Sequence, residues 1–589
     1  MIGTRKRTLS IASLFTSLLC AACGGGGGSS AGSGNVPPPV APKPNQAPEL
    51  QTAPTSIKAI VDHPLDVDAI GGGNWFKDPD DDPLTYTVTL EREEAGQPWR
   101  GLRVSGTHIV GTPTSGTSSS EASAVRVEVR DGRGGLLRWS FALVIDVNAA
   151  PTVAHPLESR LVSLGSQVDI DTRSAFVDSD GDRLTYEVKL GPQSHGLRVE
   201  GARIVGAMDS FGAVFATVSA DDGFGGHTEH AFAIAAPAPE TRTPTVPAVP
   251  FRYEDDPTTL PASVNFSRES FAPLWDTNAP AMTDNHTTNA GAALGRVLFY
   301  DRRLSISNKA SCSSCHHQQH GFAAPEKLSA GLEGELTRRN VMGLTGVRFN
   351  FSNTFFADNR VRGLEALVLL PIQDTRELGQ PLPMLVEKLA ATDFYPPLFQ
   401  AAFGTPEVTS DRIAKALAQF LRSIVGFDTK FDRAFQPHDE ASTVAPESVL
   451  TPQEIRGNNI FIGEGHCFFC HSMGAQTLDN AANNGLDAEP ADSGSGGGVF
   501  RAASLRNVAL TAPYMHDGRF ATLRDVINHY SEGVVETTNT DPRLRGMNLN
   551  NSARLHLSEE DKDALEAFLH TLTDENVATD PKFSDPFPP

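Results

Sequence analysis

The sequence predicts a multidomain chain, in which two all-β sandwich repeats precede a mostly α-helical unit of two domains. Three observations predict this fold class. A pattern of short strands and Gly/Asp turns occurs twice in the first half, apolar residues recur at helical spacing in the second half, and the second half carries one Cys/His pattern twice. At 589 residues the chain is long enough for several domains.

The first half contains an internal repeat. Residues 76–90 align with 176–190, residues 101–111 with 196–206, and residues 131–135 with 222–226. Strands that alternate with Gly/Asp turns over about a hundred residues are typical of β-sandwiches. We therefore predict sandwiches over residues 48–147 and 148–238. The shared motif resembles the cadherin-like, immunoglobulin-type repeats of bacterial surface proteins, and without a catalytic pattern the two domains are expected to be spacers or adhesive modules.

Each repeat carries three alternating aspartates, and two interpretations of them remain open. Carboxylate oxygens are the hard ligands that calcium prefers. An Asp-rich turn between two strands would give the same pattern. The residues concerned are Asp78, Asp80 and Asp82 in the first repeat, and Asp178, Asp180 and Asp182 in the second.

The helical part carries Cys-x-x-Cys-His twice, at Cys312–His316 and at Cys467–His471. This spacing suits c-type haem, because two thiols reach the two porphyrin vinyl groups and the adjacent histidine reaches the iron. A four-cysteine zinc site gives no reason for a histidine after each pair. We therefore predict two covalently bound haem c groups, attached through Cys312, Cys315, Cys467 and Cys470, with His316 and His471 as iron ligands.

Two amphipathic helices are predicted to cover the haems. Apolar residues at 413, 417, 420, 421 and 424 recur at helical spacing, and Gly426 follows as a stop. Ser558 and Asp561 form a start resembling a capping box, and apolar residues at 564, 565, 568, 569 and 572 line one face.

The N-terminus predicts export. Residues 1–23 have the basic start, apolar middle and small residues of a lipoprotein-type signal, with Cys23 as the lipidated residue. Cys20 stands where leucine is usual, which leaves plain secretion or a membrane-retained leader as alternatives. Residues 24–47 are a Gly/Ser/Pro tether and residues 239–262 a linker. We expect a protein of the periplasm or cell surface, anchored to a bacterial membrane only by its N-terminal lipid.

The formal net charge of -22 argues against nucleic-acid binding. An acidic surface either steers a basic electron-donor protein or is simply the solvated surface of an exported protein.

Residues 263–589 resemble the bacterial dihaem cytochrome c peroxidase and MauG superfamily. The resemblance implies a peroxidatic haem c domain over 263–440 and an electron-transfer haem c domain over 441–589. It is carried by residues 294–305, 321–322, 339–340, 356–360, 364–365, 371–372, 377, 456–457 and 505–518.

The resemblance assigns His316 to the peroxidatic iron and His471 to the electron-transfer iron. Glu377 matches the distal-pocket glutamate, which would take a proton from peroxide and return it to the leaving oxygen. The alternative is a solvated glutamate. Residues 322–338, where many relatives carry a distal histidine, contain none. We therefore predict a first haem that is open without prior reduction, with His317 and His320 at the surface or haem edge.

The second haem is predicted to take Tyr530 as its sixth ligand, the MauG-like arrangement, with Met515, Met547 and His529 as rivals. The resemblance also implies calcium at Asn340, Thr511 and Pro513. Two positions depart from the family: Leu367 replaces a glutamine and Ala357 replaces the tryptophan between the haems. The only tryptophan of this region, Trp275, lies far upstream, so electrons would pass by Phe355 or Phe356, or more slowly.

These observations predict a haem peroxidase that reduces hydrogen peroxide at the first haem with electrons relayed through the second. Its partner is either a small cytochrome c or copper protein that donates electrons, or a protein substrate as in MauG-like chemistry. The alternative is a non-enzymatic exported dihaem protein for electron transfer or surface binding.

Overall fold

The computed structural model describes residues 43–93, 97–114, 120–253, 285–350, 353–435, 437–438, 442–443, 445–471, 481–545 and 552–588. The predictions for Cys20, Cys23, Trp275 and Met547 fall outside these ranges. Within them, no helix combines the length and the apolar character needed to cross a membrane.

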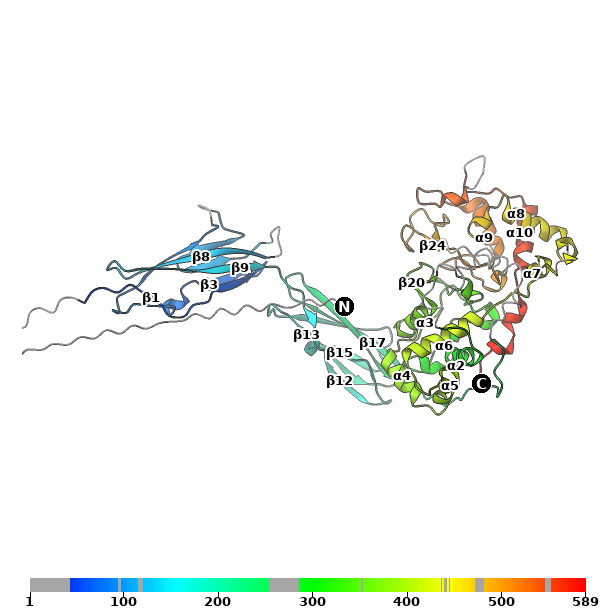
Figure 1. The fold of residues 1–589 in the computed structure, drawn as a ribbon, viewed down its shortest axis with the longest axis horizontal. Helices are drawn as coiled ribbons and strands as arrows, with labels where there is room; N and C mark the ends of the chain where they lie inside the picture. The colour runs from blue at the N-terminus through cyan, green and yellow to red at the C-terminus, as the bar shows by residue number, and fades with distance from the viewer. Residues whose placement is uncertain are drawn as a thin grey trace, which may run out of the picture. The chain divides into compact units, whose positions relative to one another are not determined.

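The two repeats fold into β-sandwiches of the same topology, which confirms the predicted fold class (Figure 1). The first has sheets ordered β2-β9-β8-β5 and β3-β7-β6, and the second has sheets ordered β11-β18-β17-β14 and β12-β16-β15. A short pair accompanies each, β1 with β4 and β10 with β13. Within the larger sheets, β2 with β9 and β11 with β18 are parallel, and the other pairs are antiparallel.

The strands of the first sandwich are β1 (Glu49–Leu50), β2 (Ser56–Ile60), β3 (Leu65–Asp68), β4 (Phe76–Lys77), β5 (Thr85–Leu90), β6 (Leu102–Ser105), β7 (His108–Gly111), β8 (Ser120–Arg130) and β9 (Leu136–Asp146). Those of the second are β10 (Thr152–Val153), β11 (Arg160–Leu161), β12 (Gln167–Asp171), β13 (Phe176–Val177), β14 (Thr185–Leu190), β15 (Leu197–Glu200), β16 (Arg203–Ala207), β17 (Gly212–Asp221) and β18 (His227–Ala236).

Each sandwich has its own apolar core. Alternate residues of β8, Val125, Val127 and Val129, are fully buried, as the period of two along a strand requires. The chain divides into two compact units, Met1–Val147 and Asn148–Pro589. The second sandwich therefore belongs to the same unit as the helices. The sequence repeat did not predict this difference, because it predicts the same fold and role for both copies.

The helical region is built from α2 (Asn289–Tyr300), α3 (Leu364–Gln373), α4 (Leu382–Ala390), α5 (Tyr395–Phe403), α6 (Ser410–Ser423), α7 (Lys430–Phe435), α8 (Pro452–Ile462), α9 (Leu523–Asn528) and α10 (Glu559–His570). Short strands connect them: β19 (Thr354–Phe355), β20 (Val361–Arg362), β21 (Pro437–His438), β22 (Ser442–Thr443), β23 (Ala481–Ala482) and β24 (Phe500–Arg501).

Both predicted amphipathic helices form. The first is α6, whose N-cap is Thr409, and the second is α10, whose N-cap Ser558 accepts a hydrogen bond from the Asp561 N–H. The threonine and serine oxygens satisfy donors at the helix starts that have no partner inside the helix.

The helical region repeats one packing arrangement twice. In the first half α2 packs on α6, and a Cβ at Gly295 would overlap the Ala416 carbonyl oxygen. In the second half α8 packs on α10, and a Cβ at Gly457 would overlap the Ala564 carbonyl oxygen. One glycine in each pair thus lets two helix backbones approach closely.

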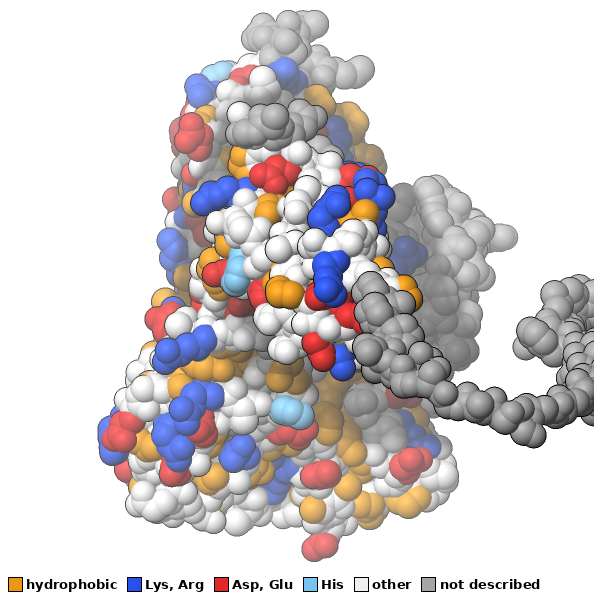
Figure 2. Space-filling model, turned by 90° about the vertical axis from the view of Figure 1, so that its left-hand side faces the viewer, with side chains coloured by type: hydrophobic (Ala, Val, Ile, Leu, Met, Phe, Trp, Pro, Cys, Tyr) orange, Lys and Arg blue, Asp and Glu red, His pale blue; other side chains and the backbone are white. Residues whose placement is uncertain are grey.

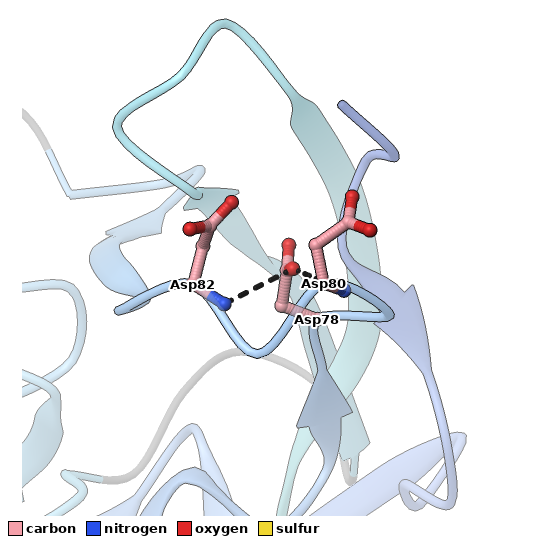
Figure 3. A group of neighbouring side chains, drawn as sticks. All are labelled: Asp78, Asp80 and Asp82. Carbon is pink, nitrogen blue, oxygen red and sulfur yellow. Dashed lines mark hydrogen bonds between the residues drawn. The ribbon is translucent and has the colours of Figure 1, made fainter. Parts of the chain in front are cut away.

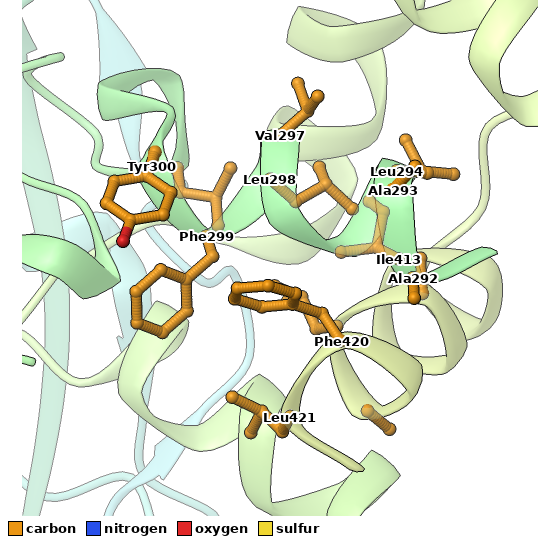
Figure 4. Packing of buried hydrophobic residues seen from close by; sticks show 14 of the residues in the cluster. Ala292, Ala293, Leu294, Val297, Leu298, Phe299, Tyr300, Ile413, Phe420 and Leu421 are labelled. Carbon is orange, nitrogen blue, oxygen red and sulfur yellow. The ribbon is translucent and has the colours of Figure 1, made fainter. Parts of the chain in front are cut away.

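The same spacing places a phenylalanine pair in each half. Phe299 contacts Phe420, with ring centroids 5.3 Å apart, and Figure 4 shows these rings at the α2–α6 interface. Phe461 contacts Phe568 at 5.2 Å in the second half. Phe299 also lies 6.4 Å from the His316 ring, and Cys467 packs against the cluster that contains Phe461 and Phe568.

The predicted linker is described as far as Tyr253, and this part packs on the helical region. Tyr253 is buried, and its hydroxyl donates to the Lys582 carbonyl oxygen at 2.6 Å. The Ala238 N–H donates to the Ser307 carbonyl oxygen at 2.9 Å. The chain that leaves the second sandwich is therefore fixed along the helices.

Candidate functional site

Both Cys-x-x-Cys-His motifs line one cavity of about 770 Å³. Its wall is largely apolar, and each amphipathic helix contributes leucines to it. These are Leu417 and Leu421 from α6, and Leu565 and Leu569 from α10. The cavity spans both halves of the helical region, as expected for two neighbouring prosthetic groups.

Each motif forms a single helical turn that directs its groups to one side. The His316 N–H donates to the Cys312 carbonyl oxygen at 3.0 Å, and the His471 N–H donates to the Cys467 carbonyl oxygen at 2.8 Å. The four cysteines are free thiols. Desolvation raises the pKa of Cys312 and of Cys467 to about 12, which favours the neutral thiol form of these two side chains.

Both motif histidines are oriented for iron binding. His316 Nδ1 donates to the Phe322 carbonyl oxygen at 2.7 Å, and His471 Nδ1 donates to the Ala503 carbonyl oxygen at 2.9 Å. Since Nδ1 carries the hydrogen, Nε2 is the atom that would bind an iron. Burial lowers the pKa of His316 to about 4, which keeps its ring neutral. Thiols, histidines and apolar cavity all fit two haem c groups.

Glu377 lines the cavity beside the first motif. It lies in the turn after α3, where its N–H donates to the Asp374 carbonyl oxygen at 3.0 Å. Desolvation raises the pKa of Glu377 to about 7, with a further contribution from the negative charge of Asp374, while Arg360 lowers it. Its negative charge contributes to the raised pKa of Cys315 after desolvation, and to that of Cys312 after desolvation and the charge of Cys315. The carboxyl group and both thiols line the same cavity.

Tyr530 lines the cavity beside the second motif. It lies in a π-helical turn, η11 (His529–Gly533), that continues α9, and such turns are frequent at functional sites. Asn484 Nδ2 donates to the Tyr530 hydroxyl at 3.4 Å and to Met515 Sδ at 3.4 Å. Desolvation raises the pKa of Tyr530 to about 12. An iron ion would have to displace this phenolic proton.

The rivals of Tyr530 differ in their positions. Met515 also lines the cavity and shares the Asn484 amide. His529 Nε2 donates to the Asn484 carbonyl oxygen at 3.0 Å, so its ring is engaged with the backbone.

Arg339 joins the two halves of the site. It donates to Asp358 at 2.6 Å in the first half and to Asp492 at 2.7 Å in the second. Hydrogen bonds to both carboxylates keep the pKa of Arg339 above its ordinary value. Its guanidinium also lies 5.4 Å from the ring of Phe500, which stacks on His516 at 3.9 Å.

The segment that carries Ala357 lies where the halves meet. The Arg501 N–H of β24 donates to the Ala357 carbonyl oxygen at 2.8 Å. Phe355 and Phe356 line the cavity on either side of the chain here, and the Arg360 guanidinium lies 3.6 Å from the Phe356 ring centroid. Leu367 lines the cavity as well.

The three residues predicted to hold calcium all line the cavity. The Asn340 N–H donates to the His516 carbonyl oxygen at 2.8 Å, and its amide Nδ2 donates to the carbonyl oxygens of Glu326 and Lys327 at 3.2 Å each. In this orientation, Oδ1 is the Asn340 side-chain atom that would be offered to a cation.

Residues 322–338 form a loop whose Ala330, Gly331, Thr337 and Arg338 line the cavity. His317 and His320 contact each other, with ring centroids 6.4 Å apart, and the cavity wall formed by described residues includes neither. The open first haem stays a prediction.

The aspartates of the sandwiches form two compact groups. Asp78 Oδ1 accepts hydrogen bonds from the backbone N–H groups of Asp80 and Asp82, as Figure 3 shows. Its Oδ2 is buried without a hydrogen-bond partner. In the second repeat the group consists of Asp178, Asp182 and Asp222. Asp222 was not among the predicted residues, and the predicted Asp180 accepts the Ala149 N–H through its Oδ2, as Asp80 accepts the Gln46 N–H in the first repeat.

Several residues near the site were not found from the sequence. Asp374 and Arg360 act on Glu377 through space, and Asn484 contacts Tyr530 from a distant segment, so no spacing in the sequence predicts these interactions.

On the face drawn in Figure 2, basic and acidic side chains are interspersed, with no extended area of one sign.

The comparisons with known proteins agree with this site. Residues 289–440 match the sequence profile of the family described as di-haem cytochrome c peroxidase. The methylamine utilization protein MauG of Methylorubrum extorquens is 31% identical over 315 residues, which cover 51% of this chain and 83% of the relative. A cytochrome c551 peroxidase of Pseudomonas aeruginosa is 33% identical over 253 residues, covering 40% and 69%.

A solved structure of a MauG-like protein associated with microbial copper homeostasis is 32% identical, with a TM-score of 0.45, covering 52% of this chain and 95% of that one. The sequence relationship to MauG extends over most of the relative. The chain therefore belongs to the dihaem cytochrome c peroxidase and MauG family of haem c oxidoreductases.

Proposed function

We propose that the protein reduces hydrogen peroxide at the first haem, with electrons relayed through the second. The observation that carries the proposal is the position of Glu377, which lies beside the first motif in the cavity that both motifs line. A haem held by Cys312, Cys315 and His316 would supply the iron that binds peroxide and the electrons for breaking its oxygen–oxygen bond.

The side chains around the first motif supply proton transfer. The Glu377 carboxylate accepts a proton from the attacking peroxide oxygen and returns it to the leaving oxygen, which departs as water. Its pKa of about 7 suits both directions of transfer near neutral pH. Arg360 lines the same cavity and places a positive charge near the carboxylate.

We propose MauG-like ligation of the second haem, with Tyr530 as the sixth ligand. The absence of histidine from residues 322–338 supports a first haem that reacts without prior reduction. The electron partner would be a small cytochrome c or copper protein, and a basic one would suit the net charge of -22. A protein substrate is the MauG-like alternative.

The test is peroxide turnover by the full-length holoprotein. Glu377→Gln keeps the shape of the side chain but removes the base, and we expect turnover to fall about a hundredfold or more with unchanged haem spectra. Glu387→Gln, an exposed position on α4, is the matched control. Turnover that is equal in the two variants would remove Glu377 from the mechanism.

The absorption spectrum of fully ferric protein, before and after one equivalent of peroxide, tests the open first haem. An immediate Soret change is expected. A change only after one-electron reduction would indicate a conventional peroxidase and a closed first haem. Failure to respond in either redox state would favour the non-enzymatic electron carrier.

We propose calcium at Asn340, Thr511 and Pro513, and a second calcium at Asp78, Asp80 and Asp82. The buried, unpartnered Asp78 Oδ2 supports the second site, because a simple turn leaves that oxygen unsatisfied. Metal analysis should show one calcium fewer in Asn340→Ala and one fewer in Asp78→Asn, with Asn459→Ala unchanged. Equal calcium content in all four proteins would refute both sites.

We propose that the protein is exported and held at a bacterial membrane by lipid on Cys23. The basic and apolar leader supports this. Cys23→Ser should abolish radiolabelled fatty acid incorporation and release the protein from the membrane fraction. A membrane-bound, unlabelled Cys23→Ser protein would indicate a retained leader instead.

A further inference from the structure

The second β-sandwich contacts the chain on both sides of Glu377. The first contact runs through residues 329–337, which form a hairpin. The Gly331 N–H donates to the Glu335 carbonyl oxygen at 2.7 Å, and the Thr337 N–H donates to the Ser329 carbonyl oxygen at 2.9 Å. Ala330, Gly331 and Thr337 line the haem cavity, so this hairpin forms part of its wall.

The tip of the hairpin is held by the sandwich. Glu333 Oε2 lies 2.9 Å from His195 Nε2, and Glu333 Oε1 accepts the Ala213 N–H at 2.7 Å. The two side chains are only 6% and 9% exposed. His195 Nδ1 in turn lies 2.8 Å from Ser210 Oγ. A buried carboxylate with two partners from one sandwich is a specific contact, since loss of either leaves a buried polar group unsatisfied.

The hairpin lies directly against the turn that carries Glu377. A Cβ at Gly331 would overlap the Arg376 carbonyl oxygen. The neighbouring Leu332 is buried in an apolar cluster whose other members come from the sandwich and from the start of the haem domain. These are Ala213, Ala233, Ala235 and Ile306.

The second contact is direct. Gly379 has a φ of +58°, and a Cβ there would overlap the Phe215 ring of β17. The Leu378 carbonyl oxygen accepts the Ile306 N–H at 3.0 Å, which fixes the same turn from the other side. Arg376 therefore lies against a hairpin that the sandwich holds, and Gly379 lies against a ring of the sandwich itself. These contacts limit the movement of the turn on both sides of Glu377.

The first repeat acts as an internal comparison. At the positions that align with His195 and Phe215, it carries Arg100 and Ala124. The contact residues are thus particular to the copy that lies in the same compact unit as the haem domains.

We propose that the second sandwich is a positioning element of the peroxide pocket, with His195 and Phe215 fixing the turn of Glu377. The domain is then not a spacer, and the inference rests on the proposed role of Glu377. Displacing a reacting group by about 1 Å can lower a rate a hundredfold. Contacts that hold the turn of Glu377 in place can therefore control turnover.

The experiment combines hydrogen exchange with turnover in full-length holoprotein. We expect Phe215→Ala and His195→Ala to speed amide exchange in residues 374–380 several-fold and to slow turnover about tenfold to a hundredfold. Phe211→Ala and His227→Gln, which alter partly exposed residues of the same sandwich, are the matched controls. Should an alanine variant fail to fold, Phe215→Leu and His195→Gln provide milder versions with smaller effects in the same direction.

Non-additivity distinguishes positioning from general damage. If Phe215 acts through Glu377, the double variant Phe215→Ala/Glu377→Gln should be no slower than Glu377→Gln alone. Exchange and turnover at control levels in both sandwich variants would overturn the inference. If Glu377→Gln itself retains full turnover, the proposed function fails, whereas faster exchange in residues 374–380 would still show that the sandwich holds the turn.

Discussion

Under the proposed ligation, one residue, Tyr530, would set the spin state and reduction potential of the second haem. It lies in the π-helical turn after α9 and lines the cavity, where Asn484 contacts both it and Met515. An oxygen ligand favours the ferric state and lowers the reduction potential of iron.

We expect Tyr530→Phe to convert the second haem from low spin to high spin and to raise its reduction potential. Electron paramagnetic resonance and redox titration measure the two effects. Tyr514→Phe is the control, because Tyr514 also lines the cavity but its hydroxyl donates to the Val508 carbonyl oxygen. If Met515→Leu produces the change and Tyr530→Phe does not, methionine is the ligand.

If Glu377 is the base, turnover should depend on pH. Desolvation and then Asp374 raise its pKa to about 7, and Arg360 opposes the rise. Since the ionised form is the base, turnover should increase as pH rises through about 7 and then level off. Asp374→Asn should move the midpoint to lower pH and Arg360→Gln to higher pH.

The control for this pH profile is Glu377→Gln, in which no carboxyl group titrates at the position, so the dependence near pH 7 should disappear. If neither Asp374→Asn nor Arg360→Gln moves the midpoint of the pH profile, a group other than Glu377 is the one that titrates.

At the residue scale, the sequence predicts which residues form the site better than it predicts the burial and the neighbouring charges that set their pKa values. The two Cys-x-x-Cys-His motifs were predicted from local spacing and Glu377 from family resemblance, and in the structure all of them line one cavity. The influence of Asp374 and Arg360 on the Glu377 pKa was not predicted, because it depends on burial and on distances through space. The ligand role of Tyr530 stays a prediction.

At the scale of elements, two glycines determine how closely the helices pack. In a helix interior, replacing glycine by alanine ordinarily stabilises by about 1 kcal/mol. At Gly295 and Gly457, however, the new Cβ would overlap a backbone carbonyl oxygen of the facing helix. Overpacking of this kind costs about 1–3 kcal/mol, so the unfavourable effect should win.

We therefore expect Gly295→Ala to lower the thermal unfolding temperature of the first half of the helical region, and Gly457→Ala that of the second half. Circular dichroism measures the loss of helix, and haem absorbance measures the loss of the haem environment. Gly191→Ala is the control, because a Cβ there makes ordinary van der Waals contacts. Unchanged unfolding in the two helix variants would mean that α2 and α8 can move away without cost.

Elements were predictable where periodicity is strong. Alternation along the β strands and the spacing of apolar residues in α6 and α10 gave the fold class and both helices. The doubled arrangement of α2 on α6 and α8 on α10 was not predicted, because a close approach of backbones appears in the sequence only as one glycine in each helix.

At the scale of the whole molecule, the two sandwiches differ although their sequences repeat. The first has a complete apolar core of its own and belongs to the unit Met1–Val147. The second belongs to the unit of the haem domains and shares a cluster with Ile306 and Leu332. The repeat alignment alone gave both the same role, since it compares their cores and turns rather than their contacts.

Two internal deletions test this difference, and both keep the leader and tether of the chain. Deleting residues 48–147 removes a unit with its own core, and we expect peroxide turnover and the unfolding of the haem domains to stay unchanged. Deleting residues 48–236 exposes Ile306 and Leu332 and removes both partners of Glu333. Burial of these groups is lost, so unfolding should occur at lower temperature and turnover should fall. Equal behaviour of the two shortened proteins would mean that the haem domains need neither sandwich.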